Sequence, residues 1–336
     1  MMDLEEMKLR RLSGQHLLEP VDSQTAVKDL CGLQAQFLSH ALHGLSIRSE
    51  DPRTEGMVKS WTNRGTMHLI SMDDLPLCLH QGRSHHLRPV DTLESDAYLD
   101  ARRKTYFADL IVDAISQGID QRDALKQLCE KAGMTEGERK SLFDPWGGLI
   151  RALCESGKIC HKVQETKAYQ LCPSFEPMSQ VQAELELARR YFTHFGPATV
   201  RDAAYFFGTT QKKIKACLTE LPVQETVWNG NTYFYIGREF SETAIPQCLF
   251  LSGFDQLILG YEKTENLFLY KEHMREIFTL AGIVRPALLI NGNVAGWWSR
   301  KGRKITVYRF HDIDKDLIAQ KAGELWGKCP ITFREV

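Results

Sequence analysis

The sequence has almost no net charge, no long apolar run and no recognisable leader. Its 42 lysines and arginines are balanced by 43 aspartates and glutamates, which leaves a formal net charge of −1. A chain of this charge that binds nucleic acid must gather its positive side chains locally. No stretch approaches the roughly 18 apolar residues of a membrane-spanning helix, and the acidic N-terminus has no apolar segment of a signal peptide. We therefore expect no membrane association and a cytoplasmic location.

Cysteine pairs at metal-binding spacing are also missing. The nine cysteines are an odd number and include no Cys-x-x-Cys pair, which argues for reduced thiols and against a disulfide framework or a structural zinc site. The pair His85-His86 has no acidic or cysteine partner at ligand spacing. We therefore predict no metal and no cofactor. The share of hydrophobic residues, 43%, is that of an ordinary soluble globular protein, and 336 residues suffice for two or three domains.

Two segments of the chain share one order of expected elements, three helical stretches followed by two short strands. In the second of them Thr199 is expected to cap a helix, and the Asn229-Gly230 pair between the last two strands is a strong hairpin signal. The first segment has helices at 107–118, 121–133 and 145–157 and strands at 158–164 and 167–173; the second has helices at 185–196, 197–208 and 209–221 and strands at 223–230 and 231–237. This is the order of a winged-helix module, whose third helix can enter a DNA major groove. Two occurrences favour an array.

The two ends of the chain complete the predicted organisation. The N-terminal hundred residues fit a degenerate third copy, and the pattern becomes more β-like from about Phe240, with strands broken at Asn291-Gly292-Asn293 and at residues 300–304. The predicted fold class is α+β, with tandem winged-helix (helix-turn-helix) modules and a C-terminal β-rich region that carries a basic hairpin. The expected domains are residues 1–105, 106–176, 177–240 and 241–336.

Positive charge gathers at two places. Between Val294 and Phe310 there are five basic residues and no acid, and Trp297 and Trp298 lie just before them. The basic residues are Arg300, Lys301, Arg303, Lys304 and Arg309. A basic turn with adjacent indoles suits phosphate contacts or insertion into a DNA groove, and a solvated hairpin is the alternative. Lys212 and Lys213, in the presumed third helix of the second module, form a weaker basic group.

Two further places offer polar groups to a pocket. The stretch 61–75 is expected to form a strand on which Arg64, Thr66 and His68 point one way. Arg64 suits a phosphate and His68 an acid, a base or a hydrogen-bond donor, although from spacing alone a satisfied polar strand face is the better explanation. Asp255 lies inside an apolar run, where a carboxylate is either structural or catalytic.

Gln34 and Gln36 flank a single alanine just after Gly32, where we expect a non-helical kink. An amide has no pKa near neutrality and cannot act as a general base, but it can orient a water molecule. In extended backbone the two side chains would project to the same side, whereas in a helix they would diverge by about 200°. Such a pair suffices only where the leaving group departs easily, as a purine made cationic by alkylation at N7 or N3 does. Two amides that cap a helix end remain the alternative.

Five stretches of the sequence together resemble the AlkZ family of winged-helix DNA glycosylases, whose members excise alkylated purines and, in some cases, unhook interstrand crosslinks. They cover nearly the whole chain in order, which is more specific than any one motif. The stretches are LCGLQAQ at 30–36, WTNRGTMHLI at 61–70, YFTHFGPATVRDAAYFFG at 191–208, FLSGFDQLILGYEK at 250–263 and NGNVAGWW at 291–298.

The resemblance implies a function for these residues. The Gln-x-Gln signature of the family, which is Gln-x-Asp in a sister branch, falls on Gln34 and Gln36 and implies that they position the hydrolytic water at the sugar C1′. It also implies that a β-hairpin, here residues 291–305, reaches the DNA. The substrate would be double-stranded DNA with alkylated or crosslinked purines, bound by a monomer on the nucleoid in base excision repair.

Two other functions fit a winged-helix array. A DNA-binding transcription regulator without chemistry would usually dimerise to match two half-sites, and the sequence has no coiled-coil heptads to support a dimer. A protein-binding scaffold would leave the basic hairpin without a use.

Overall fold

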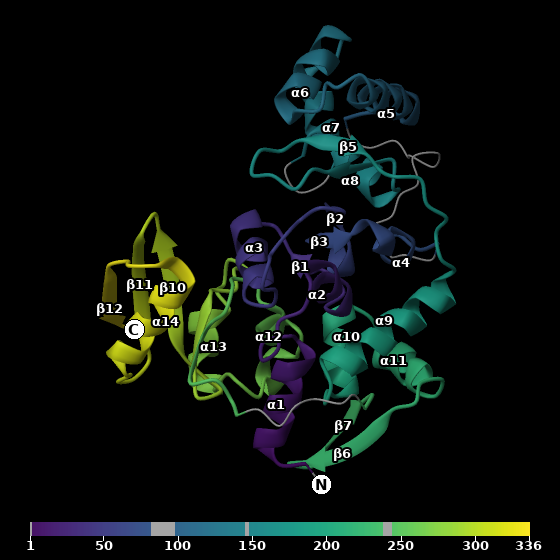
Figure 1. Cartoon of the computed structure of the whole chain (residues 1–336). Helices are drawn as coiled ribbons and strands as arrows, with labels where there is room; N and C mark the ends of the chain where they lie inside the picture. The colour runs from purple at the N-terminus through teal and green to yellow at the C-terminus, as the bar shows by residue number, and fades with distance from the viewer. Residues whose placement is uncertain (1, 82–97, 145–147, 238–243) are drawn as a thin grey trace. The chain divides into compact units, whose positions relative to one another are not determined.

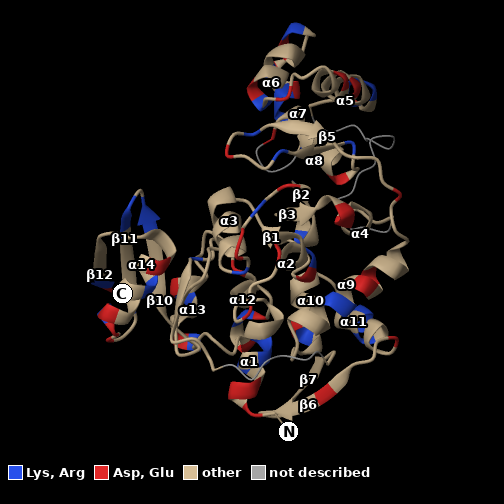
Figure 2. Cartoon of the chain, in the orientation of Figure 1, with Lys and Arg blue, Asp and Glu red and all other residues tan. Residues whose placement is uncertain are grey.

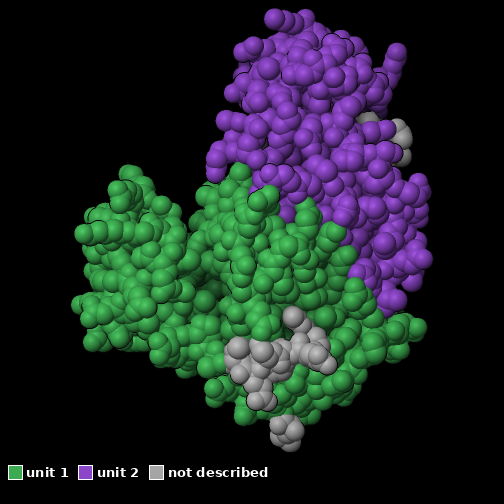
Figure 3. Space-filling view, viewed as in Figure 1, with its two compact units in different colours: residues 1–53, 187–336 green, residues 54–186 purple. Residues whose placement is uncertain are grey.

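The computed structural model describes residues 2–81, 98–144, 148–237 and 244–336, so His85 and His86 lie outside the described residues. The described residues form a mixed α+β protein (Figure 1), which confirms the predicted class. Two compact units divide the chain, residues 1–53 with 187–336, and residues 54–186 (Figure 3). No described helix combines the length and apolarity needed to cross a membrane. The predicted division into four domains stays a prediction.

The unit of residues 54–186 combines an antiparallel sheet with a helical core. β2 pairs with β3 and with β4, and β4 pairs with β5. The helices α5 to α8 bury one apolar cluster, and on α5 the spacing of Phe107, Ile111 and Ile115 places all three on the same face. The elements are β2 (Met57–Trp61), η1 (Asn63–Gly65), β3 (Met67–Ser71), η2 (Met72–Asp74), α4 (Leu75–Cys78), α5 (Ala101–Ser116), α6 (Arg122–Lys131), α7 (Glu136–Leu142), α8 (Gly148–Glu155), β4 (Ile159–His161) and β5 (Tyr169–Leu171).

Two expectations for this unit are wrong. Four helices precede the β4–β5 hairpin instead of three, because Thr135 and Glu138 form a capping box that begins α7. The stretch 61–75 is not one strand. It closes the β2–β3 hairpin through a turn at η1, where Arg64 has a left-handed backbone with φ of +56°.

The other unit begins with α1 (Leu4–Gly14), α2 (Ser23–Asp29), β1 (Leu33–Gln34) and α3 (Leu38–Ser46). It continues from Leu187 within α9 (Gln180–His194), followed by α10 (Val200–Phe207), α11 (Gln211–Leu218), β6 (Gln224–Trp228) and β7 (Asn231–Tyr235). Thr199 and Asp202 form a capping box on α10, and Asn229 and Gly230 have the positive φ values of a tight hairpin turn. These local expectations are confirmed.

A five-stranded sheet in the order β12-β11-β10-β9-β8 ends the chain. Its pairs are antiparallel except β11 with β12, because α14 carries the chain back across the sheet between them. The helix α1 lies beside α12 (Figure 1), where Leu12 joins the core around Leu257. The elements are β8 (Cys248–Phe250), α12 (Gln256–Leu259), η4 (Lys263–Glu265), η5 (Lys271–His273), α13 (Met274–Ile277), β9 (Ala287–Ile290), β10 (Asn293–Lys301), β11 (Lys304–Arg309), α14 (Lys315–Trp326) and β12 (Ile331–Glu335).

Candidate functional site

The segment that carries the two glutamines leaves a helix abruptly. At the end of α2 the N–H of Cys31 donates to Lys28 O at 3.1 Å, and the N–H of Gly32 donates to Val27 O at 2.9 Å. These are the two bonds of a Schellman motif, which ends a helix with a residue in the left-handed region. Cys31 takes φ of +54° and Gly32 takes φ of +91°. The non-helical kink expected at Gly32 is confirmed.

The two carboxamides face each other beyond this kink. Gln34 lies in β1, and its Nε2 donates to Oε1 of Gln36 at 3.0 Å. Gln34 is buried, with 7% of its surface accessible, whereas Gln36 is exposed. Extended backbone at Gln34 places the side chains of residues two apart on the same side, which allows this bond. The pair therefore joins a fixed amide to one that solvent or a ligand can reach.

The first turn of α12 and the loop before it fix the backbone that leads to Gln34 and Gln36. Nε2 of Gln256 donates to Gly32 O at 2.6 Å. The preceding residue, Asp255, caps α12 by accepting from the N–H of Leu257 at 3.0 Å, and it also accepts two bonds from Arg48, at 2.7 and 3.0 Å. Burial raises the pKa of Asp255, but the adjacent Arg48 outweighs it and holds the pKa below its usual value. Asp255 is thus a buried structural acid.

Two rings beside Gln36 belong to the same surface. Phe37 is 49% exposed, and its ring stacks on Phe254 with centroids 6.0 Å apart. His40 packs so closely on Gly253 that an added Cβ would lie 2.9 Å from the imidazole. Burial lowers the pKa of His40, so the ring is neutral at physiological pH. The sequence pattern does not reveal either ring, because nothing in residues 250–263 indicates that they pack on residues 31–40.

The basic turn lies between β10 and β11, where Lys301 pairs with Lys304 across Gly302 and Arg303. Figure 2 shows Lys and Arg gathered there, and residues 300–304 are all exposed. Trp298 is different: it is 6% exposed, and its indole N–H donates to Leu251 O at 2.9 Å. Its indole is therefore a core side chain and not a surface group, contrary to the expectation from the sequence. Trp297 is partly buried and stacks on Tyr308 with centroids 3.7 Å apart.

The remaining predicted residues lie elsewhere. Arg64, Thr66 and His68 belong to the unit of residues 54–186 and share no strand face, since only His68 lies within β3. Thr66 Oγ1 donates to Asn63 O at 3.1 Å, and the fully buried His68 ring contacts Thr66 O through Nδ1 at 3.0 Å. Lys212 and Lys213 are exposed on α11.

Comparison with known proteins identifies the family. The family model described as DNA glycosylase AlkZ-like matches residues 27–323 of the chain. The interstrand DNA cross-link repair glycosylase of Streptomyces sahachiroi is 25% identical over an alignment 334 positions long that covers 90% of this chain and 89% of that protein.

The fold agrees with this match. The structure of Streptomyces sahachiroi DNA glycosylase AlkZ superposes on the chain with a TM-score of 0.76 at 20% identity, and the superposition covers 100% of both chains. The match to the family model spans most of the chain and includes the Gln34–Gln36 segment. The chain therefore belongs to the AlkZ-like DNA glycosylase family and is a hydrolase, a DNA N-glycosylase.

Proposed function

We propose that this chain hydrolyses the N-glycosidic bond of purines alkylated at N7 or N3, as a monofunctional glycosylase whose water is positioned by Gln34 and Gln36. The observation that carries the proposal is the 3.0 Å bond between the two carboxamides in non-helical backbone. This bond brings the two carboxamides together next to the exposed side chain of Phe37, the following residue in the sequence.

The chemistry needs little from the protein because the lesion is already a cation. The C1′–N9 bond breaks with its electron pair going to the base, which neutralises the positive charge and leaves an oxocarbenium-like sugar. A water oxygen then bonds to C1′, and its proton leaves to solvent. Donation from Gln34 fixes the Gln36 amide, whose Oε1 has a second lone pair that can accept a hydrogen bond from this water. Orientation of the water is the contribution we assign to the pair.

The rest of the surface would hold the DNA. We assign α9, α10 and α11 with the β6–β7 hairpin to one winged helix, and the helices α5 to α8 with β4 and β5 to another. Residues 300–304 and the exposed lysines of α11 would contact phosphates, while Phe37 would stack on a base. The relative from Streptomyces sahachiroi is named as a cross-link repair glycosylase, and we extend interstrand crosslinks to the substrates proposed here. A purely regulatory role is not favoured, because the family is one of enzymes.

The test is release of 7-methylguanine from duplex DNA under single-turnover conditions. The double variant Gln34→Ala with Gln36→Ala should lose about 100-fold or more in rate, because a misplaced reactant costs about that much. The chain provides a matched control in Gln180 and Gln182, a second Gln-x-Gln pair that lies in α9. Their side chains bond to Glu184 and Ser179, not to each other. Loss of rate in the control as well, or full activity without Gln34 and Gln36, would refute the proposal.

A further inference from the structure

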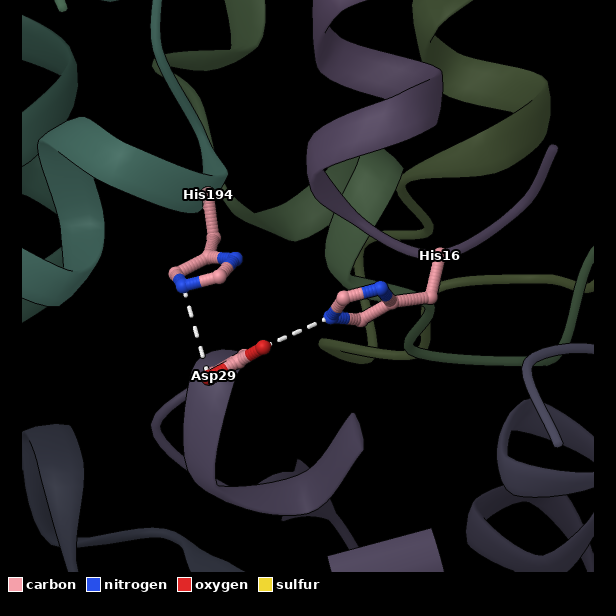
Figure 4. A group of neighbouring side chains, drawn as sticks. All are labelled: His16, Asp29 and His194. Carbon is pink, nitrogen blue, oxygen red and sulfur yellow. Dashed lines mark hydrogen bonds and ion pairs between the residues drawn. The ribbon is translucent and has the colours of Figure 1, made fainter. Parts of the chain in front are cut away.

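Three side chains from separate helices meet at a point that the glycosylase proposal does not use. His16 follows α1, Asp29 ends α2 and His194 ends α9 (Figure 4). His16 Nε2 lies 2.8 Å from Asp29 Oδ2, and His194 Nε2 lies 3.3 Å from Asp29 Oδ1. Gly14 permits the approach of α1 to α9, because a Cβ there would lie 2.4 Å from His194 O.

The hydrogen bonding of His194 sets its tautomer. Its Nδ1 lies 3.1 Å from Gly14 O, which can only accept, so Nδ1 carries a proton. In the neutral ring the Nε2 lone pair then faces a carboxylate oxygen, an arrangement that needs either a second proton on the ring or a cation between the two. A histidine that donates Nδ1–H to a backbone carbonyl while Nε2 faces the site is the usual arrangement of a metal ligand.

His16 occupies a backbone position where glycine is usual. Its N–H donates to Ser13 O and the N–H of Leu17 donates to Leu12 O, both at 3.0 Å, so α1 ends in a Schellman motif with His16 in the left-handed region at φ of +58°. The chain thus places an imidazole where a hydrogen would fit better, and it buries that imidazole to 3% exposure. An unfavourable backbone conformation at a polar side chain is a mark of functional sites.

The charges and access also suit a cation. Asp29 supplies a carboxylate whose two oxygens each lie against one of the imidazoles. The side chain of Asp29 is 24% exposed, which gives solvent a path to the cluster. Arg190, whose guanidinium donates to Lys28 O at 3.0 Å, is a nearby positive charge that opposes cation binding.

We propose that His16 Nε2, the Asp29 carboxylate and His194 Nε2 bind one divalent transition-metal ion, with zinc preferred and water at the remaining position. The ligand atoms all lie within 4.8 Å of one another, so small rotations bring them to the bond lengths of about 2.0–2.2 Å that zinc takes with nitrogen and oxygen. Two imidazoles and one carboxylate are a ligand set that zinc accepts. The ion would join the C-terminal ends of α1, α2 and α9. Its ligand Asp29 lies five residues before Gln34 in the sequence.

The experiment measures binding by the full-length chain and needs no glycosylase activity. After dialysis against a chelator, the protein is titrated with Zn²⁺ by calorimetry and with Co²⁺ by visible absorption, which reports tetrahedral coordination. One ion per chain is expected. Asp29→Asn and His194→Gln should each weaken binding by about 100-fold. Each removes a direct ligand, so the loss should reach the upper end of the 10- to 100-fold range that is typical for residues that only hydrogen-bond to a ligand. His16→Gly should weaken it equally while keeping the fold, because glycine suits the left-handed position.

Two further variants distinguish a specific metal site from non-specific metal binding. His311→Ala removes an exposed histidine outside the cluster and should leave the affinity unchanged. Arg190→Gln removes the opposing charge and should leave affinity equal or tighter. Wild type that binds no more Zn²⁺ than Asp29→Asn, or an affinity that falls equally in His311→Ala, would overturn the proposal. The three side chains would then be a hydrogen-bonded ion triad.

Discussion

Gln256 donates a 2.6 Å hydrogen bond to the carbonyl oxygen of Gly32, and this bond joins residues 224 positions apart in the sequence. Gly32 is where the chain leaves α2 and turns toward Gln34, so the bond fixes the backbone that carries the candidate catalytic pair. Asp255, the residue before Gln256, is in turn fixed by Arg48. The precision of a site depends on such supporting contacts.

Replacing Gln256 with methionine tests this support, because methionine has a similar length and no donor. Gly32 O is then left buried without its partner, which should lower the free energy of unfolding by about 1–3 kcal/mol. The excision rate should fall by about tenfold or more, since the Gln34 backbone loses its anchor. Urea denaturation and single-turnover excision of 7-methylguanine measure the two effects. Equal rates in Gln256→Met and wild type would show that Gly32 is held without this bond.

Substitution at position 36 separates the need for an acceptor from the need for bulk. Gln36→Asp keeps an oxygen that can accept from Gln34 Nε2, whereas Gln36→Leu matches the size of glutamine without any polar atom. We expect the aspartate variant to retain excision within about tenfold and the leucine variant to lose about 100-fold, because only the former holds the Gln34 amide and a water in place. Single-turnover excision rates on DNA that contains 7-methylguanine distinguish the two variants. A leucine variant as active as the aspartate variant would contradict a role for the hydrogen bond.

The features that the sequence predicted correctly are those that neighbouring residues decide. The helix cap at Thr199, the hairpin turn at Asn229-Gly230 and the kink at Gly32 each depend on a few consecutive residues. α7 was equally predictable, because Thr135 and Glu138 carry the spacing of a capping box. These local signals place elements of the fold, and the kink at Gly32 predicts that the helix ends before Gln34 and Gln36.

The features that the sequence did not predict depend on residues far apart in the chain. Trp298 packs in a core with Phe250 and Trp326, which are distant in the sequence. Its position just before the basic turn therefore led to the wrong prediction of a surface side chain. The bond from Gln256 to Gly32 has no local signature either. The prediction of one strand over 61–75 was wrong for a different reason. Arg64 adopts a left-handed turn conformation that is uncommon for residues other than glycine and that its residue type does not indicate.

The buried pair of Arg48 and Asp255 should be the strongest single ionic contribution to stability at the site. Asp255→Asn leaves Arg48 charged in the core without its counter-ion, which should lower the free energy of unfolding by about 3–5 kcal/mol. Asp51→Asn is the control, because Asp51 and Arg53 form an ion pair whose side chains are 68% and 70% exposed. That control should change stability by less than about 1 kcal/mol. Urea denaturation at pH 7 compares the two, and similar losses would contradict the assignment.

The same pair gives a pH dependence of definite sign. The folded-state pKa of Asp255 lies below its ordinary value because of Arg48, which for aspartate is about 3.9. The stabilisation is therefore complete above about pH 4 to 5 and is lost as the pH falls through the folded pKa. The stability difference between wild type and Asp255→Asn should stay constant from about pH 7 to 5 and shrink below about pH 4. A difference that grows with acid would show that the carboxyl is not ionised in the folded state.

The basic turn should contribute to binding and not to chemistry. Changing Lys301, Arg303 and Lys304 to alanine should weaken binding to duplex DNA and reduce the slope of log affinity against log salt by about 0.9 for each phosphate that the turn no longer neutralises. Changing Lys315, Lys321 and Lys328 to alanine removes the same charge from α14 and the loop after it, so this triple variant separates a specific interaction from net charge. Fluorescence anisotropy between about 50 and 200 mM salt gives both slopes. Because the turn carries none of the proposed catalytic groups, excision at saturating enzyme should stay near the wild-type rate. Equal slopes in the two triple variants would mean that DNA does not touch the turn.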